Sequence, residues 1–426
     1  MTKTFPRYGF AAKILLAAVL AVPAVHSVVA NGFRNPPAGG EELGQIGGKI
    51  ASVDDASAIS QNPANLVSVT NRQVLAAATI VNAEAKFTSP MGGSATTKDD
   101  WKFLPDVYGA WPVMGDKLAF GFGITTPFGQ STEWSKDSIL RYTAPYYAEI
   151  TVVDFTPTVA YRLNDQLSLG AGVDVFWSDF NVKQIYPWSA VTRDPAAPDG
   201  QAEFSADGEG IGGNVALTWD ATKRQRVALT YHSPVTVDYD GSFRVDNIPP
   251  AVSMAMPMIT QRSDFSTKID FPAVAGLGYL FKATDKLKLE ADVEWIEFSR
   301  YDDLPLNAHN DSPLLQSSSI PQNWKDTWTF GVGADWQLSQ KIVLRAGYIY
   351  VESPIPDSTL APTLPDADRH VVSIGIGYKY RGQSLDLAYA HSFFDDRNVQ
   401  NNINPAYNGK YELTSDLIGV SYGYNF

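Results

Sequence analysis

The chain has 426 residues, a formal net charge of -13 at pH 7 and no cysteine. The acidic balance argues against a nucleic-acid partner, because phosphate binding needs clustered Lys and Arg. The lack of thiols excludes disulfides and thiolate metal sites. Aromatic residues make up 12% of the chain beside 33 Gly and 27 Pro, which is typical of all-β structure with many turns.

Residues 1–30 predict a secretory signal peptide. Basic residues precede an apolar run from Ile14 to Val25, and small residues close the segment at Ala30. We expect the mature chain to start at Asn31. Cleavage there removes three basic residues and no acid, which takes the net charge from -13 to -16. No later segment reaches the roughly 20 consecutive apolar residues that a spanning helix needs, so a membrane assignment must rest on strands.

Residues 31–72 lack the period-two alternation of strands and are rich in Gly, Ala, Ser, Asn and Asp. They precede the first expected strand, which runs from Gln73 to Phe87. A barrel much wider than eight strands leaves an open lumen, and about forty compact residues can plug it. We therefore predict a hatch at residues 31–72 and a barrel at residues 73–426.

Period-two alternation recurs along the rest of the chain. In the last segment, Leu413–Phe426, Ile418 and Val420 fall on one face, and Gly419 and Ser421 fall on the other. Short polar turns are expected at Met114–Lys117, Asn164–Gln166, Asp220–Gln225, near Asp285, at Ser339–Lys341 and at Arg381–Gln383. Six turns give twelve strands, and the first and last strands make 14. Long polar segments connect the strands at the opposite rim. This pattern predicts an all-β fold: a 14-stranded antiparallel transmembrane β-barrel with both termini on the periplasmic side.

Several landmarks of this sequence resemble a known family. They are Asn31-Gly32-Phe33, Asp54-Asp55-Ala56, Asn62-Pro63-Ala64, Val227 to Ser233, Trp324-Lys325-Asp326, Ser353 to Pro356 and Pro365 to Arg369. In this order they resemble the outer-membrane long-chain fatty acid and hydrocarbon transport proteins of the FadL/TodX type. The resemblance implies a 14-stranded barrel closed by an amino-terminal hatch. It also implies a solute that binds among the outer loops, moves to a pocket above the hatch and leaves sideways beside an inward-bent third strand.

The resemblance assigns roles to two short segments. The third strand is expected at Leu118–Thr126, with Gly121 and Gly123 inside it and Pro127 at its end, and these residues weaken ladder pairing where the wall would open. Glycines that face the lumen are also common in any barrel. Asn62, Pro63 and Ala64 are candidates for a gating element of the hatch. The alternative is an ordinary Asn-Pro turn.

Candidate ligand-binding residues are Phe33 in the motif at the mature start, together with Arg141, Tyr142, Lys183 and Lys325. The cations are candidates because Arg pairs bidentately with carboxylates, although a solvated loop position would explain them equally. The basic residues that fatty-acid members place around the head group are not clearly reproduced, since Gln184 and the stretch Ser319-Ile320-Pro321 occupy those places. An uncharged hydrocarbon or aromatic substrate is therefore nearly as well supported as a fatty acid.

Signals for other chemistry are weak. Gly208, Gly210 and Gly213 match G-x-G-x-x-G, but they lead into a strand at Val215–Trp219, whereas a dinucleotide site needs a following helix. The histidines lack metal-ligand spacing and no G-x-S-x-G elbow occurs. We thus expect no catalytic residue, no metal and no cofactor. The hypothesis is a monomeric, passive outer-membrane channel for hydrophobic small molecules, in contact with membrane lipid and lipopolysaccharide. A general diffusion porin and an outer-membrane hydrolase are the alternatives.

Overall fold

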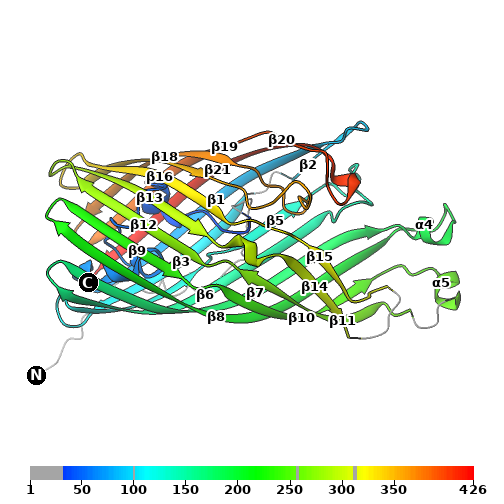
Figure 1. Ribbon diagram of the computed structural model, residues 1–426, viewed down its shortest axis with the longest axis horizontal. Helices are drawn as coiled ribbons and strands as arrows, with labels where there is room; N and C mark the ends of the chain where they lie inside the picture. Colours follow the sequence, from blue (N-terminus) through cyan, green and yellow to red (C-terminus); the bar gives the residue numbers. More distant parts are fainter. Residues whose placement is uncertain (1–31, 99–100, 256–258, 310–313) are drawn as a thin grey trace, which may run out of the picture.

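The computed structural model describes residues 32–98, 101–255, 259–309 and 314–426, so the predicted signal peptide lies outside the described residues. The strands form one closed antiparallel barrel of 14 spans (Figure 1), and the predicted fold class is confirmed. Uninterrupted spans are β1 (Gln73–Thr88), β3 (Lys102–Pro112), β6 (Tyr147–Asn164), β7 (Leu167–Tyr186), β8 (Gly200–Thr222), β13 (Leu287–Ile296), β16 (Thr327–Gln337), β17 (Ile342–Val351), β18 (Arg369–Tyr380), β19 (Gln383–Phe394) and β21 (Gly409–Asn425). Pairing of β1 with β21 closes the barrel.

Three spans are each built from two strands with a short break between them. They are β4 (Leu118–Thr125) with β5 (Gly129–Glu133), β9 (Gln225–His232) with β10 (Val235–Val245), and β11 (Arg262–Phe271) with β12 (Val274–Lys282). Each break contains a proline, namely Pro127, Pro234 and Pro272. Proline has no N–H to donate to the ladder, which fits the interruption of the ladder at these three positions. Pro105 in β3 and Pro157 in β6, by contrast, lie within uninterrupted spans.

The two rims of the barrel differ in the length of their connections. The short turns and the chain end at Phe426 lie at one end, drawn at the left of Figure 1. The loops of the other end carry β2 (Ser94–Thr96), α4 (Trp188–Thr192), α5 (Pro250–Ala255), η2 (Phe298–Arg300), β14 (Asp303–Ala308), β15 (Ser318–Pro321), β20 (Arg397–Val399) and η3 (Pro405–Tyr407). All six predicted turns join strands at the short-turn end. This asymmetry is that of outer-membrane barrels.

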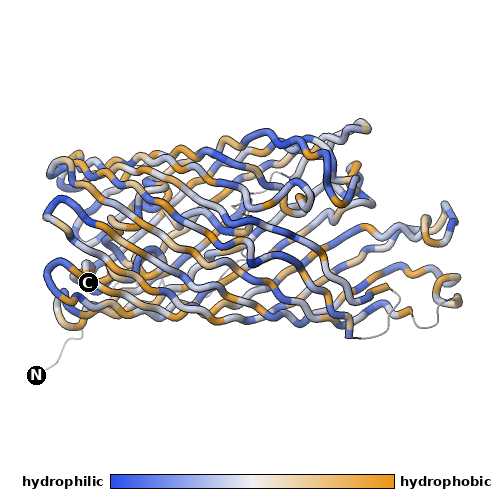
Figure 2. Tube along the Cα trace, viewed as in Figure 1, coloured by the Kyte–Doolittle hydropathy of each residue, from blue (hydrophilic) through white to orange (hydrophobic). Residues whose placement is uncertain are grey.

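Side chains alternate between lipid and lumen along each strand. On β18, Val372 and Ile374 are 47% and 62% exposed, whereas Ser373 between them is 2% exposed. Apolar residues recur along the strands over the whole barrel (Figure 2). On β13 the lumen-facing side carries Glu290, which is buried among hatch residues and accepts the N–H of Ala51 at 2.5 Å. A polar interior and an apolar exterior are what a barrel in a bilayer requires.

The lumen is filled by the hatch, whose described part is residues 32–72. It contains α2 (Gly39–Gly44), α3 (Ala58–Gln61) and the 3-10 turn η1 (Pro63–Ser68), and β1 begins directly after it at Gln73. No helix among the described residues is long and apolar enough to cross a membrane. The hatch lies close against the wall: a Cβ placed on Gly170 of β7 would lie 2.2 Å from the carbonyl carbon of Pro63. Only glycine leaves room for the backbone of η1 at this point.

A buried group of charges fixes the hatch to the opposite wall. Arg345 of β17 is 4% exposed, and its guanidinium lies 3.2 Å from Glu41 of the hatch and 2.6 Å from Asp386 of β19. Glu41 also pairs with Lys49 of the hatch at 2.7 Å. Such a group is costly to break, because removing one partner leaves the others charged and unpaired.

We expect Gly170→Ala to displace η1, because the added Cβ would occupy the space of Pro63 and Ala64. Hydrogen exchange of the hatch amides should become faster in the purified protein while the barrel strands stay protected. Gly213→Ala is the matched control, since a Cβ there meets only one backbone oxygen, at 3.3 Å. Equal exchange in both variants would contradict tight packing at Gly170.

We expect Arg345→Met to loosen the hatch by about 3–5 kcal/mol, because Glu41 and Asp386 would remain buried without their cation. In planar bilayers this variant should show frequent large openings where the unmodified protein is quiet. Arg262→Met is the control, since its side chain is 71% exposed. A quiet Arg345→Met channel would show that this ion group does not hold the hatch in place.

Candidate functional site

A cavity of about 250 Å³ lies between the hatch and the lumen wall. The hatch contributes Arg34, Asn35, Glu42, Lys49 and Ile50, and the wall contributes residues of almost every span around the lumen. The wall residues include carboxyl groups, aromatic rings and one histidine: Asp106, Thr126, Phe128, Asp154, Asp174, Phe176, His232, Val235, Phe271, Asp292, Glu294 and Arg369. The wall of the cavity is therefore both polar and aromatic.

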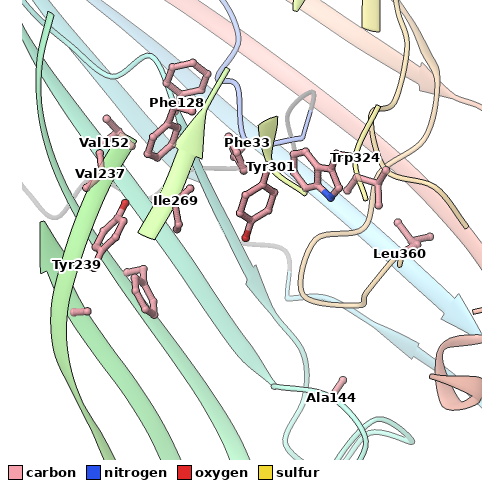
Figure 3. Packing of buried hydrophobic residues seen from close by; sticks show 14 of the residues in the cluster. Phe33, Phe128, Ala144, Val152, Val237, Tyr239, Ile269, Tyr301, Trp324 and Leu360 are labelled. Carbon is pink, nitrogen blue, oxygen red and sulfur yellow. The ribbon is translucent and has the colours of Figure 1, made fainter. Parts of the chain in front are cut away.

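Above this cavity the lumen is lined by an apolar cluster that we call the aromatic column. Its rings come from β7, β8, β10 and β11, and neighbouring spans place them in contact. Ring centroids are 4.5 Å apart for Phe204 and Phe243, 5.5 Å for Phe204 and Phe265, and 5.3 Å for Phe180 and Tyr239. Phe176, Phe271 and Phe128 continue the same cluster toward the hatch, with centroids 5.1 to 5.9 Å apart. Val237 and Ile269 fill the space between these rings (Figure 3).

Phe33 of the hatch lies at the lower end of the aromatic column. Its ring centroid is 4.9 Å from Trp324, 5.2 Å from Phe271 and 5.4 Å from Tyr301. Figure 3 shows Phe33, Tyr301 and Trp324 side by side. Phe33 is 4% exposed. The residue predicted to contact a ligand therefore occupies an aromatic environment of the kind that would hold one.

The chain on both sides of Phe33, residues 32–36, is hydrogen-bonded to the break between β4 and β5, and we call it the tail. The Gly129 N–H donates to the Phe33 carbonyl at 2.7 Å, and the Asn35 N–H donates to the Pro127 carbonyl at 3.0 Å. The Asn35 side chain donates to the carbonyl of Thr126 at 2.8 Å. The tail thus serves as the strand partner of a segment that has left the regular wall.

Next to this break, two neighbouring spans of the wall are not joined by a ladder among the described residues. β3 pairs with β4 from Val107 to Pro112, and its outer half, Lys102–Asp106, pairs only with β1. β5 pairs with β6 along Gly129–Glu133. Within the described ranges no ladder joins β3 to β5, and we call this place the wall break. The Asp106 carboxylate bridges its lower edge, by accepting the Thr126 N–H at 2.7 Å. At its outer end the Lys98 N–H donates to the Glu133 carbonyl at 2.8 Å.

Pro127 lies at the predicted end of the third strand, inside the break. Gly121 and Gly123, by contrast, do not weaken the ladder as we expected: Gly121 is in register with Ala110 on one side and Thr158 on the other. A Cβ on Gly121 would lie 2.6 Å from the Ile59 side chain. The physical reason for glycine is therefore the close approach of the hatch.

The first residue of the tail is held by a buried carboxylate in an outer loop. Asp366 accepts the Gly32 N–H at 3.3 Å and the Ser353 hydroxyl at 2.9 Å, and it pairs with Arg369 at 3.4 Å. Burial raises the pKa of Asp366 to about 6, although the Arg369 charge opposes this shift. A second residue that holds the tail is Arg34, whose guanidinium makes two hydrogen bonds to Glu294 at 2.8 and 2.9 Å.

The predicted cations Arg141, Lys183 and Lys325 are not among the residues that line the cavity. Arg141 pairs with Asp199 at 2.8 Å in the outer loops, and the Tyr142 hydroxyl donates to the same carboxylate at 3.0 Å. Lys183 lies 3.4 Å from Glu203, and Lys325 is exposed. The structure does not bring these residues together. Three cations that sequence reasoning missed border the cavity, namely Arg34, Lys49 and Arg369. Arg34 directly follows the Gly32-Phe33 motif.

Asn62, Pro63 and Ala64 form a buried corner of the hatch. The Asn62 side-chain amide donates to the Ile50 carbonyl at 2.8 Å and to Thr218 of β8 at 3.0 Å, and its oxygen accepts the Ala64 N–H at 3.1 Å. The motif therefore caps η1 and ties it to the wall. Within the described part of the chain, no group of three or more His, Asp or Glu side chains is placed to hold a metal.

Comparison with known proteins agrees with this architecture. Two curated relatives are a Neisseria meningitidis serogroup B protein named for the outer membrane, 28% identical over 97% of this chain and 98% of its own, and the long-chain fatty acid transport protein of Escherichia coli O6:H1, 22% identical over 89% and 90%. The solved structure of the Pseudomonas putida toluene transporter TodX has the same fold, with a TM-score of 0.73 at 18% identity over 91% of this chain and 98% of that one.

The family model described as outer membrane protein transport protein (OMPP1/FadL/TodX) matches residues 23–426. This match covers the hatch, the tail and every span of the barrel. The chain belongs to the OMPP1/FadL/TodX family of outer membrane transport proteins.

Proposed function

We propose that this protein is a passive channel through which hydrophobic small molecules, long-chain fatty acids or hydrocarbons, cross the outer membrane and leave sideways into the bilayer. The observation that carries the proposal is the aromatic column, which runs down the lumen and ends at Phe33 beside the wall break. A buried apolar lining binds an apolar solute in preference to a polar one. The proposal includes no catalytic step.

The driving force is apolar contact. A solute in water gains roughly 25 cal/mol for each Å² of apolar surface that it buries, so it partitions onto the rings of the aromatic column. Leaving through the wall break into acyl chains keeps that surface away from water. No energy source is needed, because each step exchanges one apolar environment for another.

The hatch favours this function over that of a general diffusion porin. Residues 32–72 fill the lumen and are fixed to it by buried contacts such as the Arg345 ion pairs. We infer that polar solutes are thereby denied a straight path. The apolar outer surface of a single chain fits a monomer in contact with membrane lipid, and the outer loops would lie in the lipopolysaccharide layer.

We expect Phe180→Ser to lower the uptake of a radiolabelled hydrocarbon into cells that lack other hydrophobic channels by about tenfold, because the solute loses a ring in mid-path. Ile403→Ser is the control, since Ile403 is exposed in an outer loop. Full uptake by Phe180→Ser would contradict a path along the aromatic column. Steady large conductance of the unmodified protein in planar bilayers would favour the porin.

The stability of the folded protein should depend on pH, with a sign set by Asp366. Burial raises the pKa of Asp366 to about 6 in the folded protein, from an ordinary 3.8, so proton uptake favours the folded state. This stabilisation is complete below about pH 4 and is lost as the pH rises through 6. The free energy of unfolding of the purified protein should therefore contain an Asp366 contribution that is about 3 kcal/mol smaller at pH 7.5 than at pH 4.

Asp366→Asn is the matched variant, because the amide resembles the protonated acid and has no charge to bury. Its free energy of unfolding should lack this contribution. If this variant keeps the pH dependence of the unmodified protein, another group causes it.

A further inference from the structure

The cavity below the aromatic column is rich in carboxylates. Six acidic side chains border it, against three cations and one histidine: Glu42, Asp106, Asp154, Asp174, Asp292 and Glu294. They come from the hatch and from separate spans of the wall, so the fold gathers them in one place. A cavity with this lining offers many hydrogen-bond acceptors.

Each cation at the cavity is already paired with an acid. Arg34 binds Glu294 through two hydrogen bonds, Lys49 lies 2.7 Å from Glu41, and Arg369 lies 3.4 Å from Asp366. Among the described residues that line the cavity, no cation is left for the carboxylate of a ligand. A fatty-acid anion placed here would be taken out of water without a cation to pair with, which is costly for a buried charge.

Among the described residues that line the cavity, four buried side-chain oxygens lack a hydrogen-bond partner: Asn35 Oδ1, Glu42 Oε1, Asp154 Oδ1 and Asp292 Oδ1. Asp154 is the one of these that lies beside the aromatic column. Asp154 is 6% exposed; its Oδ2 accepts the Thr156 hydroxyl at 2.6 Å, whereas its Oδ1 has no hydrogen-bond partner among the described residues. Its neighbour Asp174 of β7 is engaged, with the Asn214 amide donating to it at 2.6 Å. A buried acceptor without a donor is costly unless a ligand or solvent donor supplies the bond.

This acceptor adjoins the aromatic column. Asp154 of β6 is in register with Phe176 of β7, and the Phe176 ring lies 5.9 Å from Phe128 at the wall break. A molecule with its ring among these phenylalanines would therefore have its polar end at Asp154. The cavity volume of about 250 Å³ is larger than the roughly 150 Å³ that is known to take a benzene ring.

We propose that this cavity is a selectivity subsite for hydrophobic molecules whose polar end donates a hydrogen bond, such as phenols, and that it excludes carboxylates. Asp154 Oδ1 accepts the hydroxyl of the ligand, and an anion is disfavoured because the cations that line the cavity are already paired. This inference rests on the proposed function. It narrows the substrate class from fatty acids or hydrocarbons to neutral hydrocarbons that carry a hydroxyl group.

The test is calorimetric binding of three matched ligands to the purified mature protein in detergent at pH 7.5. They are 4-ethylphenol, ethylbenzene and 4-ethylbenzoate, which share an ethyl-substituted ring. The first carries a hydrogen-bond donor, the second has no polar group and the third carries an anionic carboxylate. The phenol should bind at least tenfold more tightly than the benzoate, with ethylbenzene between them. If the benzoate binds as tightly as the phenol, the subsite proposal is overturned.

Asp154→Asn removes the charge and should cut the preference for phenol over benzoate by about tenfold. Asp165→Asn, at an exposed turn, makes the same charge change far from the cavity and should leave the preference intact. An unchanged preference in Asp154→Asn would overturn the role of Asp154, and the ligand series in the unmodified protein decides the question if that variant does not fold. The proposed channel function fails separately, if none of the three ligands binds or enters cells.

Discussion

Backbone hydrogen bonding is the constraint on which this molecule depends. In a bilayer every N–H and C=O must find a partner within the protein, and a closed barrel meets this demand without any side chain. At the wall break the ladder does not supply these partners, because Pro127 has no N–H and β5 does not pair with β3. The tail supplies the missing partners, since Phe33 accepts the N–H of Gly129 and Asn35 donates to Pro127. Closure of the wall is thus completed by the first described residues of the chain.

The lumen is divided by chemistry into two levels. The lower level joins hatch and wall through buried ions around Arg345 and through glycines that let backbones approach closely. The upper level is apolar and aromatic, from Phe243 down to Phe33. The cavity lies where the two levels meet. A solute that moves inward therefore first meets the aromatic column, which binds any apolar molecule. It then meets the cavity, where binding depends on the chemistry of its polar end.

The sequence predicted the strands that alternate cleanly and the turns that are short and polar, because both signals are local. Residues 31–72 lack alternation, and their described part holds α2, α3 and η1. The breaks at Pro234 and Pro272 were missed, because apolar alternation continues on both sides of each proline. The predicted cations are not brought together, because Arg141 pairs with Asp199, 58 residues away in another loop. The acceptor at Asp154 was missed for the same reason: its environment comes from β6, β7 and β8 together, and no local pattern records it.

The position of Phe33 has a consequence for how the channel would respond to its solute. Phe33 is an aromatic side chain covalently tied to the protein, and it already fills the contact surface between Trp324 and Phe271. A short tether holds such a group at an effective concentration of the order of millimolar. A free aromatic molecule must compete with this resident ring, so weakly binding or dilute compounds would leave the tail docked. The docked ring would thus set a threshold below which the passage stays shut.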